Sequence, residues 1–313
     1  MRLVFMGTPD FALPSLEGLL SAGYTIETVV TGPDKPRGRG RAPMPTPVKV
    51  AALAHGLRIL QPASTRDPAF AEALRGQAPE LIVVVAFRIL PPSVLAIPSR
   101  GAINLHASLL PHYRGAAPIN WALINGETLT GVTTFFLEEH VDTGAIILQR
   151  ETPIREDDDA GSLHDRLSRL GAEVVVDTVR SIEAGIPPRR AQDPAAATPA
   201  PKIFREHCMI GWDRPASAIR NLIRGLSPHP GAFTIHNGAV VKVYRSAVVD
   251  AISDLAPGEI RLQGEHMLVG TGTKALEVME LQQEGRRRMS AGEFLRGYRF
   301  TPGERFGPGP ADA

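Results

Sequence analysis

Cysteine is almost absent from this chain of 313 residues, which contains only Cys208. A single cysteine excludes an intramolecular disulfide framework and any cysteine-rich zinc or iron–sulfur site, and it fits a reducing compartment. Long apolar runs are also missing. No stretch approaches the roughly 18–20 residues of a membrane span, and the apolar run at 3–6 is too short for a signal peptide. We therefore expect a soluble, cytoplasmic protein that does not contact a membrane.

A strong excess of one charge is missing too, because 34 Lys and Arg residues stand against 33 Asp and Glu residues. Net charge therefore argues neither for nor against a polyanionic partner. Apolar residues make up 43% and charged residues 21% of the chain, a composition typical of globular proteins. The length is close to that at which a single core usually divides into two.

Three familiar sequence motifs do not occur. Gly7 ends the first predicted strand but does not begin a G-x-G-x-x-G sequence, which argues against a dinucleotide cofactor. A phosphate-binding G-x-x-x-x-G-K-[ST] loop is absent, and so is a G-x-S-x-G elbow. The sequence therefore excludes the P-loop and serine-hydrolase classes.

The first half of the chain alternates apolar runs with amphipathic stretches, the pattern of a doubly wound α/β fold with a mostly parallel sheet. Strands buried on both faces are predicted where Val, Ile and Leu are almost continuous, at 3–6, 26–31, 81–86 and 102–105. Helices are predicted between them at 14–22, 48–55 and 68–75. Two more strands, at 132–137 and 145–149, and a helix at 162–184 complete the unit. The acidic cluster at 156–159 is interpreted as the N-terminal cap of that helix rather than as a metal site.

The segment 185–201 contains five prolines and five alanines with little apolar periodicity, which predicts a linker. A helix is expected after it, at 215–226. Short β segments broken by glycine then follow, at 232–235, 240–244, 259–262, 266–269 and 275–281. They predict a small β-barrel of the OB type. We expect a domain at 1–188, a linker at 189–207 and an OB-like domain at 208–313.

Charge is distributed unevenly between these parts. Residues 1–188 carry 17 basic and 20 acidic side chains, whereas residues 189–313 carry 17 and 13. The three arginines at 286–288 and other basic residues of the second half could form a basic face. That face is either an ordinary solvated surface or the contact area for a polyanion.

Two polar residues end one of the predicted buried strands. Asn104 and His106 are two residues apart, so on a strand their side chains point to the same face. Polar groups at the carboxyl end of a central strand lie where open α/β sheets bind ligands. A hydrogen-bonded polar pair that merely finishes the strand explains the spacing equally well.

The segment that follows, 107–118, contains leucines, two prolines and a Gly-Ala-Ala run. It suits an apolar rim for a flat heterocycle, and a rigid connecting loop is the alternative. His106 and His112 are six residues apart with a proline between them, which matches no usual ligand spacing. No metal is therefore expected.

A third polar candidate is Asp142, in the sequence V-D-T-G at 141–144. Aspartate in such a sequence is most often a turn former. It becomes a candidate for catalysis only if the turn folds back over His106. Asn104, His106 and Asp142 together could perform acyl transfer without a covalent intermediate. The amide and imidazole would stabilise an oxyanion, and the carboxylate would orient the imidazole or accept a proton.

A basic stretch at 32–45 follows the second predicted strand, where connections are usually short. In it, Arg37, Arg39 and Arg41 alternate with glycine, and Lys35 adds a further cation. This composition suits a mobile cationic loop that binds a phosphate backbone or a nucleic-acid end, and a disordered surface loop is the alternative. Its position on the carboxyl side of the strands favours the functional interpretation.

Several segments together form a signature that continues along the chain. In the first half they are F-M-G-T-P-D-F-A at 5–12, P-D-K-P at 33–36, G-R-G at 38–40, P-V-K at 47–49, N-L-H-A-S-L-L-P at 104–111, Y-R-G-A-A-P-I at 113–119, G-V-T at 131–133 and D-T-G at 142–144. In the second half they are I-R-G-L-S-P at 223–228 and V-K-V at 241–243. In this order the segments resemble the methionyl-tRNA formyltransferase family over nearly the whole chain. The motif at 104–111 is specific for folate-dependent formyltransferases in general. The basic loop and the C-terminal domain point to tRNA.

The resemblance implies a Rossmann-like formyltransferase domain followed by an OB-like tRNA-binding domain. It implies an enzyme of translation initiation that transfers the formyl group of 10-formyltetrahydrofolate to the α-amino group of methionyl-initiator tRNA, without a metal. The catalytic residues would be Asn104, His106 and Asp142. The folate pocket and the tRNA-binding loop would be formed by Ser108, Leu109, Leu110 and Pro111, and by Arg37, Arg39 and Arg41, respectively.

One segment departs from the family pattern. Many members read A-Y-G-x-I-L-P after the fourth strand, whereas this chain reads A-F-R-I-L-P at 86–91. The segment is one residue shorter and has Arg88 in place of glycine. It is expected to border the folate.

Two rival interpretations remain. A formyltransferase for a small amine, such as a sugar nucleotide or a purine-pathway ribonucleotide, would share the catalytic domain but would need neither the basic loop nor a basic C-terminal domain. A non-catalytic RNA-binding module would carry a vestigial α/β domain. The presence of Asn104, His106 and Asp142 argues against that module.

Overall fold

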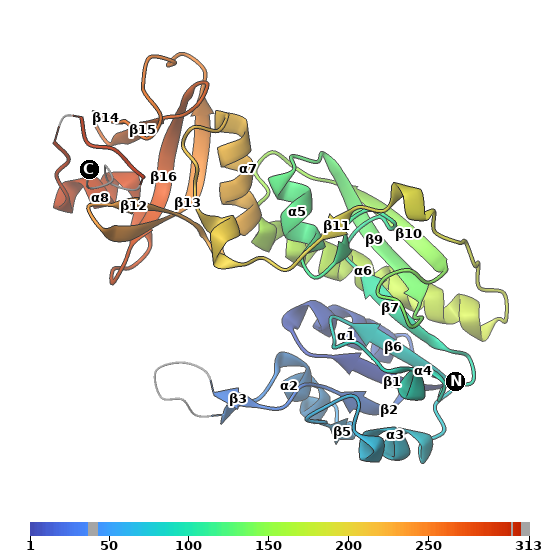
Figure 1. Ribbon diagram of the computed structural model, residues 1–313. Coiled ribbons are helices and arrows are strands. Elements are labelled where there is room, and N and C mark those ends of the chain that lie inside the picture. Colours follow the sequence, from blue (N-terminus) through green and yellow to red (C-terminus); the bar gives the residue numbers. More distant parts are fainter. Residues whose placement is uncertain (37–42, 302, 308–313) are drawn as a thin grey trace. The chain divides into compact units, whose positions relative to one another are not determined.

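The computed structural model describes residues 1–36, 43–301 and 303–307, and Figure 1 shows its helices and strands. The chain divides into two compact units. Unit 1 comprises Met1–Pro118, Leu129–Pro153 and His164–Ala200. Unit 2 comprises Ile119–Thr128, Ile154–Leu163 and Pro201–Ala313, so it includes two short segments from the first half of the sequence.

Unit 1 is built on a seven-stranded sheet formed by described residues, in the order β10-β9-β7-β6-β1-β2-β5. The strands are β1 (Arg2–Gly7), β2 (Thr25–Val30), β5 (Ile59–Leu60), β6 (Leu81–Val85), β7 (Ala102–His106), β9 (Leu129–Phe136) and β10 (Ile146–Pro153). Pairing is parallel from β5 to β7, and β9 and β10 add two antiparallel strands at one edge. The sheet is therefore mostly parallel, as predicted.

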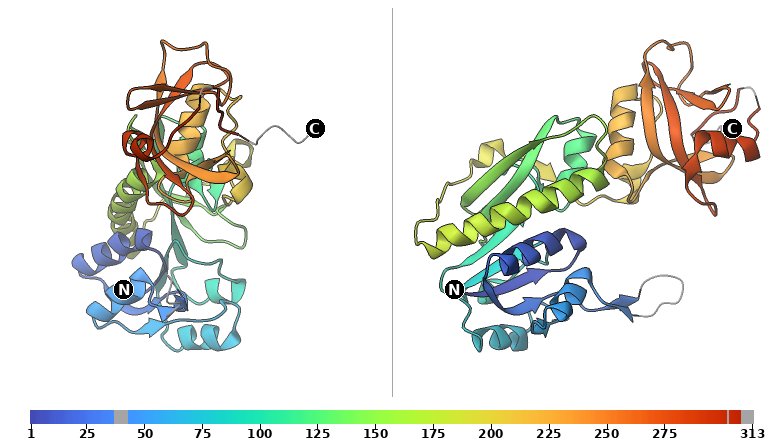
Figure 2. Two further views of the ribbon diagram at one scale, coloured as in Figure 1. Left: turned by 90° about the vertical axis from the view of Figure 1, so that its left-hand side faces the viewer. Right: turned by 180° about the vertical axis from the view of Figure 1, so that it is seen from behind.

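Helices pack against both faces of this sheet. They are η1 (Asp10–Ala12), α1 (Leu13–Ser21), α2 (Pro47–Ala54), α3 (Pro68–Arg75), α4 (Pro92–Leu95) and α6 (Ala160–Glu183). On one face, alternate side chains of β1 and β6, such as Met6 and Val84, pack with Phe70 of α3 and Val94 of α4. On the other face, a Cβ at Gly171 of α6 would meet the Leu105 side chain of β7 at 2.5 Å. Figure 2 shows α6 lying along that face, and the predicted doubly wound class is confirmed.

Local sequence explains where several helices begin. Thr46 precedes α2, and its hydroxyl accepts a hydrogen bond from the Lys49 amide, while Asp67 caps α3 in the same way through the Ala69 amide. A proline occupies the first turn of both helices. There it supplies a helical φ and its missing N–H costs nothing. Asp159 directly precedes α6, and its carboxylate accepts a hydrogen bond from the Ser162 amide at 2.8 Å, which is the capping role expected of the acidic cluster.

Unit 2 is built on an antiparallel sheet in the order β12-β13-β16-β15-β14, with the short β17 paired to β16. The strands are β12 (Ala232–His236), β13 (Ala239–Val249), β14 (Ile260–Gln263), β15 (His266–Gly270), β16 (Ala275–Gln283) and β17 (Met289–Ser290). The sheet, α7 (Ala216–Leu226) and α8 (Ala291–Gly297) enclose a separate core that includes Ile219, Leu222, Val243 and Val278. The predicted small OB-like β domain is confirmed.

The unit boundaries place residues 190–200 with the first unit. Arg190 pairs with Ile146 at the start of β10 through backbone hydrogen bonds. Further along, β11 (Pro199–Ala200) pairs in parallel with β8 (Arg114–Gly115). The composition of this segment predicts a linker, but its backbone is tied to the loop that follows β7.

Two classes of feature are absent from the part of the chain that the structure describes. No helix there combines the length and the apolar character needed to cross a membrane. Residues 1–36, 43–301 and 303–307 also contain no group of three or more His, Cys, Asp or Glu side chains arranged to hold a metal ion.

A buried histidine ties the C-terminal segment of unit 2 to β12. His236 is 3% exposed, with Nε2 3.0 Å from Glu304 Oε2 and Nδ1 3.0 Å from the Tyr298 hydroxyl. The Thr301 hydroxyl donates to the other Glu304 oxygen at 2.6 Å. This bond and the neighbouring His236 lower the pKa of the Glu304 carboxyl.

We expect Glu304→Gln to lower the free energy of unfolding of unit 2 by about 0.5–1 kcal/mol at pH 7, because the charged acceptor of two hydrogen bonds is lost. The folded pKa of Glu304 lies below its unfolded value. Its contribution is therefore present above the unfolded pKa and is lost as the pH falls through the folded pKa. Urea unfolding followed by tryptophan fluorescence measures it, since both tryptophans, Trp121 and Trp212, lie in unit 2.

Glu265→Gln is the matched control for that measurement. Glu265 pairs with Arg296 at 3.0 Å, but both side chains are more than 60% exposed, so its loss should change stability little. A loss for Glu304→Gln that is equal at pH 7 and in acid would contradict the assignment.

Candidate active site

The carboxyl end of β7 carries two polar side chains on one face, as the spacing predicts. Asn104 lies in register with Val84 of β6 and Phe135 of β9, and His106 lies beside Thr133 of β9. Asn104 is half-buried, and no hydrogen bond joins its side-chain amide to another residue within 1–36, 43–301 or 303–307. The amide is therefore available to a bound substrate.

His106 is 6% exposed, and its two ring nitrogens have different surroundings. Nε2 lies 2.8 Å from the Tyr113 carbonyl oxygen, and Nδ1 lies 3.8 Å from Asp142 Oδ2. A carbonyl can only accept a hydrogen bond, so Nε2 carries a hydrogen in this arrangement. Nδ1 is consequently the nitrogen that can gain or lose a proton, and it faces a carboxylate.

Asp142 is brought to His106 by the turn between β9 and β10. Its side chain is 11% exposed, and Oδ2 accepts a hydrogen bond from the Gly115 amide at 2.9 Å. The residue has a φ of 55°, in the left-handed region, which non-glycine residues adopt at a cost. The turn therefore folds back over His106, the condition under which the sequence made Asp142 a candidate.

Two glycines allow this close approach of backbone segments. Gly115 has a φ of 125°, and a Cβ there would lie 2.6 Å from the Ala200 carbonyl oxygen. A Cβ at Gly144 would lie 1.8 Å from the Phe136 carbonyl oxygen. No larger residue fits either position without moving the backbone. Steric contact therefore explains why glycine ends the D-T-G sequence and the R-G sequence.

The four residues predicted to line a folate pocket divide into two pairs. Ser108 and Leu110 are buried, and the Ser108 hydroxyl donates to the His112 carbonyl at 2.6 Å. Leu109 and Pro111 are only partly buried. The first pair thus fixes the loop, and the second pair leaves apolar surface exposed.

Thr133 of β9 anchors this loop to the sheet. Its side chain is fully buried, and the hydroxyl donates to the Ser108 carbonyl at 2.6 Å and accepts from the Leu110 amide at 3.1 Å. Gln149 of β10 donates to the same hydroxyl at 3.0 Å and to the Leu110 carbonyl at 2.8 Å. Strands β9 and β10 therefore set the position of the loop after β7.

The segment that departs from the family pattern has its own anchor. The Arg88 guanidinium donates to the carbonyls of Ala63 and Pro62 at 2.8 and 2.7 Å and lies 5.2 Å from the centre of the Phe87 ring. Ala86 has a φ of 49° at the end of β6. Arg88 thus ties the shortened segment to the stretch that follows β5.

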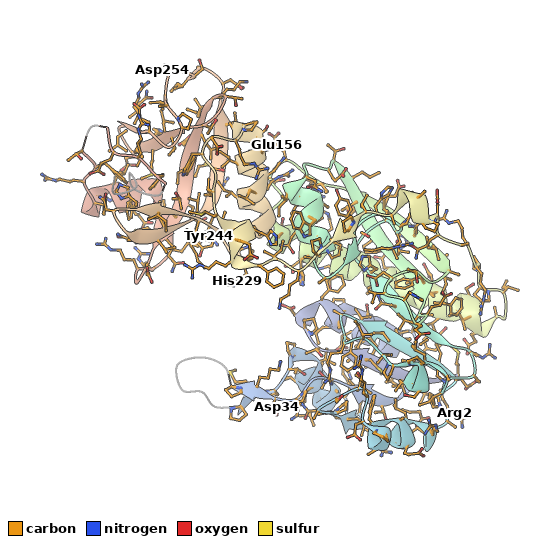
Figure 3. The ribbon with its side chains drawn as sticks, in the orientation of Figure 1. Arg2, Asp34, Glu156, His229, Tyr244 and Asp254 are labelled. Atoms are coloured by element: carbon orange, nitrogen blue, oxygen red, sulfur yellow. The ribbon has the colours of Figure 1, made fainter. Side chains whose placement is uncertain are left out.

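The three arginines of the basic loop, Arg37, Arg39 and Arg41, lie outside the described residues. The hairpin that leads into the loop is formed by β3 (Lys35–Pro36) and β4 (Pro43–Met44). Asp34 lies at the start of this hairpin (Figure 3). It accepts hydrogen bonds from the Lys49 ammonium at 2.6 Å and from the Gln61 amide at 2.7 Å, and these bonds lower the pKa of its carboxyl.

Comparison with known proteins identifies the family. Residues 1–179 match the formyl transferase family, and residues 202–299 match its C-terminal domain. The methionyl-tRNA formyltransferase of Geobacter sulfurreducens is 48% identical over 309 residues, 98% of this chain and 97% of that protein. The enzyme of the same name from Pelotomaculum thermopropionicum is 50% identical over 300 residues, 95% and 96% of the two chains. This chain belongs to the methionyl-tRNA formyltransferase family.

Solved structures agree with the family's fold. The N-formyltransferase of Helicobacter canadensis, solved with folinic acid and dTDP-3-aminofucose, superposes with a TM-score of 0.68 at 18% identity, over 89% of this chain and 98% of that one. Glycinamide ribonucleotide transformylase 1 of Symbiobacterium toebii superposes with a TM-score of 0.52 at 22% identity, over 61% and 93%. At these identities the likeness shows the fold alone.

Several residues of this formyltransferase that shape the site escape notice in the sequence. Gln192 donates a hydrogen bond to the Asp142 carbonyl, and the Thr198 hydroxyl accepts one from the Tyr113 amide. Both residues lie in the alanine- and proline-rich segment, where composition predicts a linker. Thr133 is one of several similar residues on a strand. As the polar residue of the G-V-T motif at 131–133, Thr133 could have been noticed, but no local pattern distinguishes Gln192.

Proposed function

We propose that this formyltransferase moves the formyl group of 10-formyltetrahydrofolate to the α-amino group of methionyl-initiator tRNA, in the cytoplasm. The products are formylmethionyl-tRNA and tetrahydrofolate. The similarity to relatives named methionyl-tRNA formyltransferase supports the choice of tRNA as the acceptor. The observation that carries the catalytic assignment is the pairing of His106 with Asp142, beside an Asn104 amide that has no hydrogen-bond partner among the residues that the structure describes.

The chemistry requires little activation of the nucleophile. An α-amino group titrates near 8, so a useful fraction of the amine is neutral at cellular pH. As the amine adds to the formyl carbon, negative charge develops on the formyl oxygen. The Asn104 side-chain N–H is free to donate to that oxygen, and preorganised donors of this kind are usually the largest single contribution to catalysis.

His106 and Asp142 would transfer the proton that the amine loses. The Tyr113 carbonyl holds Nε2–H, so only Nδ1 can exchange a proton with the reactants. A new C–N bond forms to the amine, which loses a proton, and the bond from the formyl carbon to the folate nitrogen breaks, so that this nitrogen needs one. The carboxylate 3.8 Å from Nδ1 would stabilise the imidazolium that carries the proton between them.

The loop after β7 fits the flat ring system of a folate. Leu109 and Pro111, which follow His106 in the chain, are partly exposed and present apolar surface. Ser108 and Leu110 are held by hydrogen bonds to the Thr133 hydroxyl. When bound, the folate supplies the formyl group. The chain's part is to hold that group within reach of Asn104 and to exclude water around it.

One reaction tests the proposed function. The purified chain is mixed with charged initiator tRNA and 10-formyltetrahydrofolate, with an amino-sugar nucleotide and glycinamide ribonucleotide as parallel acceptors. We expect formylation of the tRNA at a rate far above that of either small amine. Preference for a small amine would overturn the acceptor assignment, and absence of folate binding would favour the non-catalytic RNA-binding module.

The basic loop makes a separate prediction. Replacing Arg37, Arg39 and Arg41 by glutamine should raise the apparent KM for tRNA, on the order of tenfold, and leave folate binding unchanged. Each lost phosphate contact should reduce the slope of log KM against log salt by about 1. Steady-state kinetics between low and moderate salt measure both effects.

A matched triple variant controls for the change of net charge. Arg66, Arg75 and Arg169 are exposed elsewhere on the chain, so their replacement by glutamine should leave the tRNA kinetics close to wild type. Equal kinetics for the two triple variants would contradict the role of the loop.

We also propose that residues 208–313 form a tRNA-binding domain, linked by 189–207 to the catalytic domain at 1–188.

A further inference from the structure

A single side-chain amide, that of Gln192, joins three segments of unit 1 around the candidate active site. Nε2 donates to the carbonyl oxygens of Asp142 and Gly144, both at 2.9 Å. Oε1 accepts from the Arg114 guanidinium, at 3.1 Å from Nε and 2.7 Å from Nη2. Both amide hydrogens and both oxygen lone pairs are therefore used.

The same segment also anchors the other neighbour of the imidazole. The Thr198 hydroxyl accepts from the Tyr113 amide at 2.8 Å, and the Thr198 carbonyl accepts from the Arg114 amide at 2.8 Å. Tyr113, in turn, provides the carbonyl that faces His106 Nε2. Residues 192–198 thus support the groups at both nitrogens of His106.

We propose that Gln192 is a positioning residue, which holds the Asp142 carboxylate against His106 and so sets the turnover rate. The inference rests on the proposed function. Asp142 has a left-handed φ, and such a conformation persists only where surrounding contacts over-determine it. Without Gln192, two carbonyls of the turn lose their donor and the turn relaxes. A displacement of about 1 Å in a catalytic group can cost on the order of 100-fold in rate.

The chemistry of the site explains why glutamine is required. The position must donate twice to carbonyls and accept twice from a guanidinium, and a terminal amide does both. Glutamate would keep, and strengthen, the contact with Arg114 but would place a negative charge against the carbonyls of Asp142 and Gly144. Gln192→Glu therefore separates the positioning of Asp142 from the tethering of Arg114.

The test compares Gln192→Glu and Gln192→Ala with wild type in the tRNA formylation assay. We expect both variants to lower kcat by about 10- to 100-fold, with the KM for folate changed by less than about twofold. Gln77→Ala is the matched control. Gln77 is also a half-buried glutamine of unit 1, and it bonds to the Thr28 hydroxyl and the Ala73 carbonyl away from this site. It should leave kcat unchanged.

A second measurement reports on the site without activity. The ¹⁵N resonances of the His106 imidazole respond to the partner of each ring nitrogen. We expect the Nδ1 signal to shift in both Gln192 variants and not in Gln77→Ala. Wild-type kcat or unshifted His106 signals in Gln192→Glu would overturn the proposal. If wild type fails to formylate tRNA but the His106 signals still shift, the function assignment fails and the positioning role stands.

Discussion

We expect Asn104→Ala to lower kcat for formyl transfer by roughly 100- to 1,000-fold, the usual cost of removing one oxyanion donor. The reason is that the Asn104 amide has no partner among the described residues and shares a strand face with His106. The same observation predicts that stability is largely kept, because no intramolecular hydrogen bond is lost. Steady-state kinetics and a thermal melt on the same preparation measure the two effects.

Asn104→Leu controls for the volume that alanine removes. Leucine is of similar size but cannot donate a hydrogen bond, so its kcat should fall as far as that of the alanine variant. A leucine variant that keeps near-wild-type turnover, with an inactive alanine variant, would mean that Asn104 acts only by filling space. Near-normal turnover in both would remove Asn104 from the mechanism.

Asp142→Asn should lower kcat on the order of 100-fold or more, although it replaces only one non-hydrogen atom of the side chain. The amide oxygen of the variant can still accept from the Gly115 amide, so the turn keeps its anchor. What is lost is the negative charge 3.8 Å from His106 Nδ1. Without that charge the imidazolium loses its stabilising neighbour. Single-turnover kinetics with saturating tRNA and folate isolate the chemical step.

Asp142→Ala distinguishes the charge from the anchor. It removes both, so its thermal midpoint should fall below that of Asp142→Asn, while its kcat should be reduced at least as far. Because Asn104 and Asp142 are proposed to serve the same transition state, we expect the double variant to lose less than the product of the two single losses. Fully multiplicative losses would indicate two independent roles and would contradict the shared site.

The catalytic domain follows closely from local sequence patterns. The runs of Val, Ile and Leu predict the strands that become β1, β2, β6 and β7, because strands of a parallel sheet that is covered on both faces are rich in these residues. Period 2 alternation also places Asn104 and His106 on one face. Short elements, such as the two-residue strand β5 and the four-residue helix α4, have too few residues to show a period.

The site is less accessible to such reasoning. That Asp142 meets His106 depends on the turn after β9 folding back, and no spacing within the sequence reports a contact between residues 36 positions apart. The segment at 190–200 is the clearest case. Its prolines and alanines predict a linker, yet Gln192 and Thr198 bind the loops on either side of His106 through backbone groups that carry no sequence signature.

By itself the sequence determined the order of the longer strands and helices, the polar pair at the end of β7 and the signature of the family, since these depend on residues that are neighbours in the chain. Tertiary structure alone decided which nitrogen of His106 is held, which carboxylate faces the other, and that residue 192 supports the turn at 142. Those contacts arise where separate segments pack together, and their hydrogen bonds run largely to main-chain groups. Every residue carries such groups, so one-dimensional patterns cannot reveal them.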